Sequence, residues 1–411
     1  MLLKYAFFAL TFTNAFMHNF KVRTREGKNT FIKAFDSKEL EFNPKEFETN
    51  EKNNENFNEK SYNLNWYVIG EERKMRKNKI QKVQIWGKNY AVWSNGTKYF
   101  SIDDACSHRG ASLSIGKLNN NNIVCPYHAY EFDVNGTLKV VPGLPNFENT
   151  PCQNLNTYPI LAKNGWIYMN TISEKEFKLE TESETQTQTQ TQTQSPIFDE
   201  PESKNASFKA IFLNMEFNAY SRIVTENSLD VMHIGFVHTF GNKNDPSPTS
   251  EIPPKLVGDF PYHYKTTYEY RAGENSMVKK LFKMNDLTIE NEFILPHTTI
   301  ARVIFGKYVS SVITFALPLN LTHTKLFVKT YRNFWHERDN TIFSKWFNKF
   351  GDIFTTDMMS STVMQDKAVI ESILLERVNG LFNMKYDKIQ NVSTSLYKKL
   401  IHNISNEKSR E

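Results

Sequence analysis

One segment of the chain, CSHRGASLSIGKLNNNNIVCPYH (residues 106–128), constrains its fold more than any other feature. Cys106 and His108 form a C-x-H pair, and Cys125 and His128 form a C-x-x-H pair sixteen residues later. The chain has only three cysteines, so two of them fall in this motif and a disulfide framework is excluded. Thiolates and imidazoles at this spacing predict a metal site.

Two kinds of metal site use this set of ligands. A structural zinc site would take two cysteines and two histidines in a tetrahedron, but zinc fingers usually pair like ligands within one loop. A [2Fe–2S] cluster with two thiolates on one iron and two imidazoles on the other fits the mixed pairs better. Gly110 and Pro126 place a tight turn at each pair, so two loops could present all four ligands together.

The region around this motif has the pattern of a small β-domain. Between residues 65 and 172, short runs rich in β-branched and aromatic residues alternate with turn signals, including the hairpin dipeptides Asn95-Gly96 and Asn135-Gly136. Cys152 matches no ligand position, and we expect it to be a small buried apolar residue.

The rest of the chain predicts a second domain of mixed type. At 411 residues and 39% hydrophobic content, two packed cores are expected. Residues 173–205 contain a Thr-Gln repeat and are predicted to be a linker. Residues 206–390 combine strand patterns with helical runs, including a long helical run over residues 345–379, so we expect an α+β domain. Residues 391–411 read as a polar, weakly constrained tail.

The amino-terminal region reads as a targeting segment. A short apolar stretch ends at Ala15, a suitable site for signal-peptidase cleavage, and a basic segment follows it. Residues 1–64 are therefore predicted to be a presequence and a disordered segment, resembling the bipartite presequences of algae with complex plastids. An ordinary signal peptide or a membrane-adherent helix remains the alternative. A net charge of +5 permits an acidic redox partner or peripheral membrane association but is no nucleic-acid signature.

A second candidate metal site lies in TENSLDVMHIGFVHT. Asp230 and His233 are three residues apart and would share one face of a helix. His233 and His238 are five apart, about 140° out of phase on an ideal helix, so both reach one metal only if the helix bulges or ends between them. Gly235 lies in that gap and could permit it.

Two histidines need an acidic third ligand to form the facial triad of a non-haem Fe(II) site. The downstream helical run offers four candidate carboxylates: Asp352, Asp357, Asp366 and Glu371. Asp366 is chosen over Asp357 because its setting, Gln365-Asp366, resembles the distal ligand of a known family. Glu371 is expected to be a solvated helix residue.

Together these motifs resemble the Rieske-type non-haem iron oxygenases over residues 65–379. Within that family, Asn65-Trp66-Tyr67 and Asp230 resemble the plastid and cyanobacterial group, which contains pheophorbide a oxygenase, chlorophyllide a oxygenase and the Rieske protein of the chloroplast inner-envelope translocon. The Thr-Gln tract and the lack of a terminal C-x-x-C depart from many plant members.

The resemblance implies a small Rieske domain followed by a helix-grip-like catalytic domain. Cys106, His108, Cys125 and His128 would hold the cluster, while His233, His238 and Asp366 would hold a mononuclear Fe(II). A ferredoxin or a reductase would reduce the cluster, which passes electrons to the iron for O2 activation and oxygenation of a hydrophobic ring substrate. In the homotrimers common in this family, Asp230 would link His233 to His128 of the partner subunit, with Asn227 nearby in the same motif.

The expected substrate is a chlorophyll-related tetrapyrrole, and the expected location is a plastid, at the thylakoid or envelope. Two alternatives stay open. The first is a redox sensor or translocon-associated protein on the same fold, which would keep the cluster while tolerating loss of the mononuclear site. The second is an oxygenase or demethylase of a sterol or a small aromatic compound. Whatever the activity, Asp230 could instead cap a helix or form a local salt bridge. Hydroxylation, demethylation, desaturation and ring cleavage all use the same kind of iron site.

Overall fold

A computed structural model of the chain describes residues 66–145, 152–178, 197–258, 262–339, 341–374 and 385–408. The predicted presequence and disordered segment (residues 1–64) and the Thr-Gln tract lie outside the described residues. Among the described residues, no helix combines the length and apolarity that crossing a bilayer requires.

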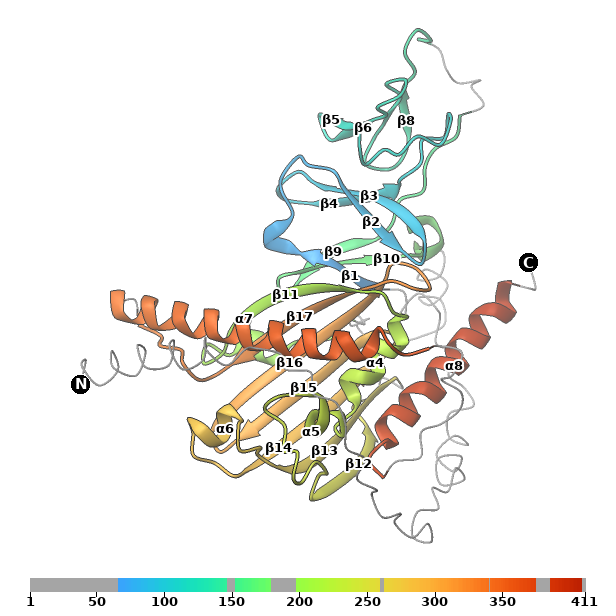
Figure 1. The fold of residues 1–411 in the computed structure, drawn as a ribbon. Coiled ribbons are helices and arrows are strands. Elements are labelled where there is room, and N and C mark those ends of the chain that lie inside the picture. Colours follow the sequence, from blue (N-terminus) through green and yellow to red (C-terminus); the bar gives the residue numbers. More distant parts are fainter. Residues whose placement is uncertain are drawn as a thin grey trace, which may run out of the picture. The chain divides into compact units, whose positions relative to one another are not determined.

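The first part of the described chain contains small antiparallel sheets (Figure 1). Three of its sheets have the strand orders β1-β10-β9, β2-β3-β4 and β5-β6-β7-β8. Their strands are β1 (Trp66–Glu71), β2 (Gln81–Ile85), β3 (Lys88–Ser94), β4 (Tyr99–Asp103), β5 (Lys117–Asn119), β6 (Asn122–Val124), β7 (Glu131–Phe132), β8 (Leu138–Val140), β9 (Ile160–Lys163) and β10 (Trp166–Asn170). A short 3-10 turn, η2 (Glu72–Lys74), follows β1.

Both predicted hairpin dipeptides form turns. Gly96 has φ +96° between β3 and β4, and the Asn95 side chain accepts from the backbone N–H groups of Thr97 and Lys98. Gly136 has φ +73° between β7 and β8, and a Cβ there would lie 2.1 Å from the Leu155 carbonyl oxygen. Glycine is therefore required at Gly136 by both the backbone conformation and the close approach.

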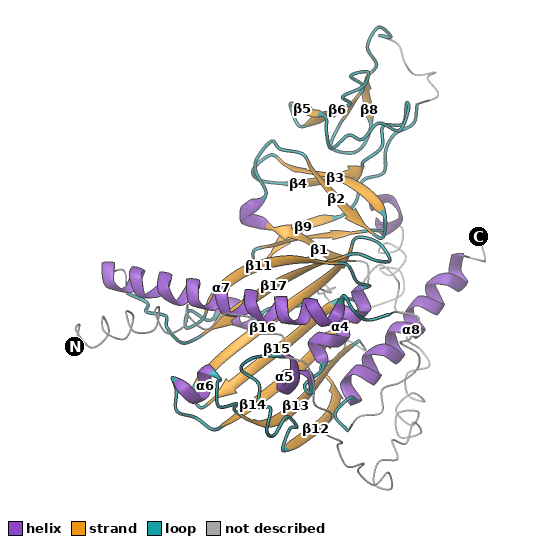
Figure 2. Cartoon of the chain, viewed as in Figure 1, coloured by secondary structure: helices purple, strands orange, loops and turns teal. Residues whose placement is uncertain are grey.

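The second part contains one large antiparallel sheet with helices on one face, so the α+β prediction is confirmed (Figure 2). Its order is β11-β17-β16-β15-β14-β13-β12. The strands are β11 (Lys209–Phe217), β12 (Ser250–Leu256), β13 (His263–Arg271), β14 (Asp286–Ile294), β15 (Thr298–Phe305), β16 (Tyr308–Pro318) and β17 (Thr324–Arg332). The helices are α4 (Ser221–Leu229), α5 (His233–Val237), α6 (Met277–Lys280), α7 (Ile342–Ile370) and α8 (Lys388–Lys408), with a 3-10 turn η3 (Pro201–Lys204) before β11.

The two faces of this sheet bury different partners because side chains alternate along each strand. Ile211 and Val328 pack with Met359 and Val363 of α7 on the helix side. On the opposite side, Phe315 and Phe327 lie in one core with Trp166 of β10, whose ring centroid is 5.6 and 5.9 Å from theirs. The first part of the chain and the sheet therefore share a continuous apolar core.

A buried ion pair reinforces this shared core. Lys329 Nζ of β17 lies 2.6 Å from the Glu200 carboxylate and donates to the Asn164 carbonyl oxygen, and Tyr331 donates to the same carboxylate. Burial raises the pKa of Glu200 and lowers that of Lys329. Two buried opposite charges are tolerated because each compensates the other; loss of either one would leave a bare charge in the core.

Two helical expectations differ from the structure. Asp230 and His233, expected to share one face of a helix, lie on either side of a helix break: α4 ends at Leu229, and α5 begins at His233. The region expected to be a weakly constrained tail forms α8 over Lys388–Lys408. Its polar side chains are partners of α4 and not a solvated surface, since Thr394 donates to Glu226 and Tyr397 shares a hydrogen bond with Tyr220.

A buried, unpaired histidine lies where the sheet meets the first strand. His297 is buried, neither of its ring nitrogens has a hydrogen-bond partner among the described residues, and its ring stacks on Tyr67 at 4.8 Å. Burial lowers the pKa of His297 to about 3. The imidazole is therefore neutral in the folded protein across the physiological range.

His297 should make the protein sensitive to acid. Below the ordinary histidine pKa of about 6.5, the unfolded chain gains a proton that the folded chain does not take up, so stability falls as pH falls. We expect on the order of 2–3 kcal/mol of this loss between pH 6.5 and 4.5. The His297→Phe variant should flatten the urea-unfolding stability curve in that window, and the exposed His323→Gln control should not. An unchanged slope in the His297 variant would contradict the assignment.

Candidate metal centres

The four predicted cluster ligands lie on two neighbouring turns of the first β region. Cys106 and His108 follow β4, and Cys125 and His128 lie between β6 and β7. Each turn is closed by backbone hydrogen bonds, from Gly110 N–H to the Cys106 carbonyl and from Ala129 N–H to the Cys125 carbonyl.

The turns bring like ligands together. The two cysteines are buried in the same cluster, while the His108 and His128 rings lie 4.7 Å apart between centroids. Burial raises the pKa of Cys106 to about 11, so a thiolate there needs a neighbouring positive charge such as a metal. The cysteine side faces the core and the histidine side is more open, which is the polarity expected for a mixed-ligand diiron cluster.

Other residues hold these turns in place. The buried Asp104 accepts from Ser112 Oγ, Ser114 Oγ and Ser114 N–H, which fixes the chain behind the first turn. Tyr130 stacks on His108 at 4.7 Å. Cys152, expected to be a buried apolar residue, is only half-buried and packs against the same cluster as Tyr130.

The turn at Val141-Pro142-Gly143 packs next to the two cysteines. Leu144 N–H donates to the Val141 carbonyl, and Gly143 has φ +77°. Val141 belongs to the same buried cluster as Cys106 and Cys125. This turn therefore shields the thiols from one side.

The second candidate centre joins α5 to α7. His233 Nε2 and His238 Nε2 are 3.1 Å apart, and Asp366 Oδ1 lies 3.3 and 3.4 Å from them. Bonds of about 2.1 Å to one metal at right angles would place donor atoms about 3 Å apart, so this spacing suits a facial triad. Among the described residues, these three form the one group whose ligand atoms all lie within 4.8 Å of one another.

Helix ends place the two histidines. His233 is the first residue of α5, which ends at Val237, and His238 follows with extended backbone (φ −85°, ψ 140°). The helix thus ends before His238. The two histidines can therefore point to one place, although they would lie about 140° apart on a continuous ideal helix. Gly235 does not bend the helix; it lets Pro246 approach, since a Cβ there would lie 2.4 Å from the Pro246 Cβ.

The electrostatics of this centre favour a cation. Asp366 Oδ1 is buried, and among the described residues its nearest possible donors are the two imidazole Nε2 atoms at 3.3 and 3.4 Å, which donate only if protonated. Burial alone would lower the pKa of His233, but the carboxylates of Asp366 and Asp230 outweigh it and raise the pKa; for His238 burial prevails, and its pKa is lowered. A positive charge between these side chains, whether a proton or a metal ion, would satisfy the otherwise orphaned carboxylate oxygen.

Gln365 is a contributor that the sequence analysis did not identify as functional. Its Oε1 lies 3.2 Å from His238 Nδ1 and accepts from Thr239 N–H at 3.3 Å. With the Nδ1 proton held there, Nε2 keeps its lone pair toward the centre. Phe240 stacks on the same ring at 4.9 Å. The position of Gln365 next to Asp366 in the sequence was the signal that could have identified it.

Asp230 acts locally in this chain. Its Oδ1 accepts from the backbone N–H groups of Met232 and His233, and its Oδ2 is 3.9 Å from His233 Nδ1. It therefore caps the start of α5 and orients His233, while its predicted link to a partner subunit stays a prediction. Asn227 contributes its backbone carbonyl, which accepts from Asp230 N–H.

The unused carboxylates of α7 have other roles or positions. Asp352 pairs with Arg332 and Lys209 at the other end of the helix, and Glu371 accepts from Asn218 N–H at the helix terminus. Asp357 lies on α7 outside the three-residue group.

Comparison with known proteins places the first centre in a family. Residues 65–159 match the Rieske [2Fe-2S] domain. The chain is 28% identical over 107 residues to a 4beta-methylsterol monooxygenase of Methylococcus capsulatus, covering 25% of this chain and 29% of that protein. It is 29% identical over 175 residues to the chloroplastic chlorophyllide a oxygenase of Chlamydomonas reinhardtii, covering 42% of this chain and 24% of that protein.

A solved structure extends the likeness to the whole fold. The structure of dicamba monooxygenase bound to dicamba superposes with a TM-score of 0.66 at 17% identity, covering 84% of this chain and 99% of that one. The chain spans less than a third of the length of the two curated relatives. The expected resemblance to Rieske non-haem iron oxygenases is thus confirmed, while relatives inside and outside the plastid both match.

The positions of the three ligand atoms predict that Asp366 binds the metal and that Asp357, on the same helix, does not. Asp366→Asn should remove the charged ligand and lower the mononuclear iron content to near zero, because two imidazoles alone hold Fe(II) weakly. Asp357→Asn, on the same helix, should retain full iron. Iron and acid-labile sulfide assays on the purified variants test this. Equal iron loss in both variants would refute the assignment of Asp366.

Proposed function

We propose that this protein is a Rieske non-haem iron oxygenase that oxygenates a hydrophobic ring substrate, with a chlorophyll-related tetrapyrrole as the first candidate. The observation that carries the proposal is the convergence of His233, His238 and Asp366 in a chain that also contains a Rieske domain. A [2Fe–2S] group and an Fe(II) ion would supply one-electron transfer and O2 activation when bound.

The residues of this chain would prepare the iron site for that chemistry. His233, His238 and Asp366 would occupy one face of the metal and leave the opposite face for O2 and substrate. Gln365 would hold the tautomer of His238, and Asp230 would orient His233 from the end of α5. The predicted trimer would give Asp230 a second contact, to His128 of the partner subunit.

The tetrapyrrole is favoured by the amino-terminal segment, which has the pattern of a plastid presequence. Coverage does not rank the substrates, because the match to chlorophyllide a oxygenase extends over 42% of this chain and the match to the cholesterol 7-desaturase of Bombyx mori over 48%. Sterols and small aromatic compounds are the competing substrates, in line with the other relatives.

The proposed reaction is tested with labelled oxygen. Reduced protein is incubated under 18O2 with a plastid pigment extract, and in a parallel arm with sterols, before mass spectrometry. We expect label in a tetrapyrrole product, with Asp366→Ala giving none and Asp357→Ala giving the parental yield. Label found only in sterol products would instead indicate that the substrate is a sterol. Iron-replete protein that labels nothing in either arm would favour a redox sensor.

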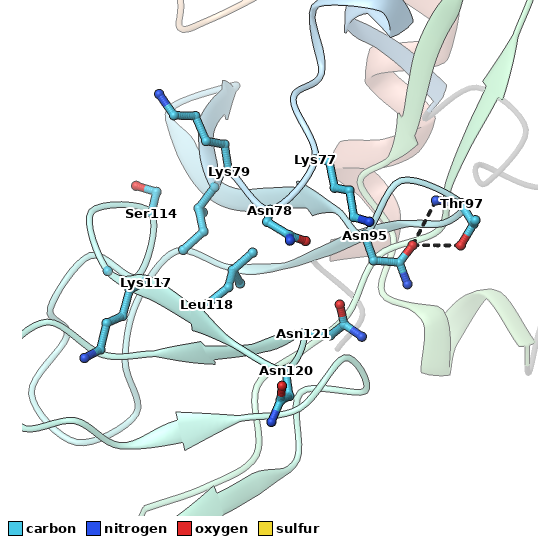
Figure 3. A pocket seen from close by; sticks show the side chains of 12 residues that line it. Lys77, Asn78, Lys79, Asn95, Thr97, Ser114, Lys117, Leu118, Asn120 and Asn121 are labelled. Atoms are coloured by element: carbon cyan, nitrogen blue, oxygen red, sulfur yellow. Dashed lines mark hydrogen bonds between the residues drawn. The ribbon is translucent and has the colours of Figure 1, made fainter.

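The electron donor is proposed to be an acidic ferredoxin that docks on a basic hollow of the Rieske domain. This hollow has a volume of about 890 Å³ (Figure 3). None of the twelve lining residues is acidic: Lys77, Asn78, Lys79, Ile80, Asn95, Thr97, Ser114, Gly116, Lys117, Leu118, Asn120 and Asn121.

The hollow lies close to the cysteine side of the cluster turns. Ser114 follows the first turn, and Gly116 packs so tightly on β6 that a Cβ there would lie 2.2 Å from the Val124 carbonyl oxygen, one residue before Cys125. Lys77, Lys79 and Lys117 are exposed, and no ion pair involves them among the described residues. Such a surface would attract an acidic carrier and speed its encounter.

Charge reversal should slow this encounter without harming the cluster. We expect Lys77→Glu/Lys117→Glu to lower the rate of cluster reduction by an acidic plant-type ferredoxin roughly tenfold at low salt, and added salt to narrow the difference. The control Lys255→Glu/Lys307→Glu makes the same charge change on the catalytic domain. Stopped-flow absorbance measures the rate, and reduction by dithionite should be equal in all variants. Equal ferredoxin rates would exclude this docking site.

A further inference from the structure

The amino-terminal half of α7 has its polarity reversed. Its inward face is small and polar: Ser344 and Thr355 are buried, and Gly351 approaches Arg332 so closely that a Cβ would lie 2.5 Å from the guanidinium. Thr355 accepts from Arg332 Nε at 2.9 Å, and Asn348 donates to the Glu337 carbonyl. A helix on a globular surface normally turns its apolar side inward.

The outward face of the same helix is apolar. Ile342, Trp346 and Ile353 are 88%, 54% and 61% exposed. At 100° per residue, they lie about 160–200° around the helix from Ser344, opposite the face that packs on the protein. None of these side chains is buried by the part of the chain that the structure describes, so an apolar surface about 16 Å long is left open there.

Aromatic rings extend this surface on one side. Trp346 stacks on Phe350 at 6.1 Å, and Phe343 stacks on Phe347 at 6.2 Å. Lys345 and Lys349 border it on the other side, and neither forms an ion pair among the described residues. The first acidic residue of α7 is Asp352, which is already paired with Arg332.

We propose that this surface, made of Ile342, Phe343, Trp346, Phe350 and Ile353 with Lys345 and Lys349 at its edge, docks on an anionic lipid bilayer. Its composition is that of interfacial helices, in which Trp and Phe enter the headgroup boundary and Lys reaches the lipid phosphates. In Figure 1, the amino-terminal end of α7 extends beyond the strands it packs on, where a flat surface can reach it. The inference is independent of the proposed activity.

A second copy of the chain fits this surface less well. An isologous dimer would place the same patch on both sides, so the unpaired Lys345 and Lys349 of each copy would border a shared apolar contact with no acid in the patch to neutralise them. Anionic lipid supplies that charge, because each lysine near such a surface gains attraction from the phosphates.

The test uses the full chain and two readouts. Vesicles of phosphatidylcholine and phosphatidylglycerol carrying brominated lipid should quench protein fluorescence, and Trp346→Phe should remove much of that quenching. The control Trp86→Phe removes a tryptophan that is 40% exposed on the Rieske domain and should leave the quenching unchanged.

Vesicle flotation gives the affinity. Trp346→Ser/Ile353→Ser should weaken partitioning roughly tenfold or more, while Ile252→Ser, at a residue 54% exposed on β12, should not. Lys345→Glu/Lys349→Glu should weaken binding to anionic vesicles roughly tenfold and leave binding to pure phosphatidylcholine vesicles near its parental level. Because every variant retains the amino-terminal segment, differences in vesicle binding between variants measure the contribution of α7.

Two outcomes would overturn the inference. In the first, the parental quenching persists in Trp346→Phe and flotation is unchanged in the serine variant. In the second, light scattering shows that the parent is larger than the serine variant, which would make the surface a contact between copies. Circular dichroism shows whether each variant is folded. If the serine variant is not folded, the conservative Trp346→Phe variant still tests the inference.

Discussion

The meeting of His233, His238 and the buried Asp366 oxygen is the constraint on which the catalytic half of this structure depends. Three donor atoms can share one point only if α5 ends at Val237 and α7 passes beside it. The break at Asp230 sets where α5 begins, since its carboxylate accepts from the Met232 N–H just before that helix. A buried carboxylate oxygen is unfavourable until a positive charge compensates it, and either a metal ion or a proton on His233, whose pKa Asp366 raises, would do so.

The same logic explains how the two halves are joined. Trp166 inserts between rings of the sheet, and the Lys329–Glu200 pair lies beside it without access to water. Apolar burial provides the attraction, while the ion pair tolerates only one arrangement, because a displaced partner would leave a bare charge.

The sequence indicated candidate ligands more readily than the residues that support them. The candidate ligands could be recognised from the sequence because ligand type and spacing are local properties. They are Cys106, His108, Cys125, His128 and the histidines of the Asp230–His238 motif. The contribution of Gln365 could not be recognised in this way, because it depends on contact between residues far apart in the sequence. Its side chain meets Thr239 only when α7 packs beside that residue. The α8 helix was missed because its polar residues suggest solvent exposure, whereas Thr394 and Gln390 are buried against α4. Polar composition does not distinguish a solvated face from a buried hydrogen-bonded one.

The reversed polarity of α7 follows from what its inward face must accommodate. Arg332 is fully buried beneath the helix, and its guanidinium needs acceptors from Thr355, Asp352 and the Gly351 carbonyl, so small and polar residues are required there. That requirement leaves the outward positions free of any role in folding. Positions with no folding role on a soluble surface are usually polar, because exposed aromatic side chains promote aggregation. Ile342, Trp346 and Ile353 depart from that expectation on one contiguous stripe, and a stripe that packs against nothing in the described chain needs a partner outside it.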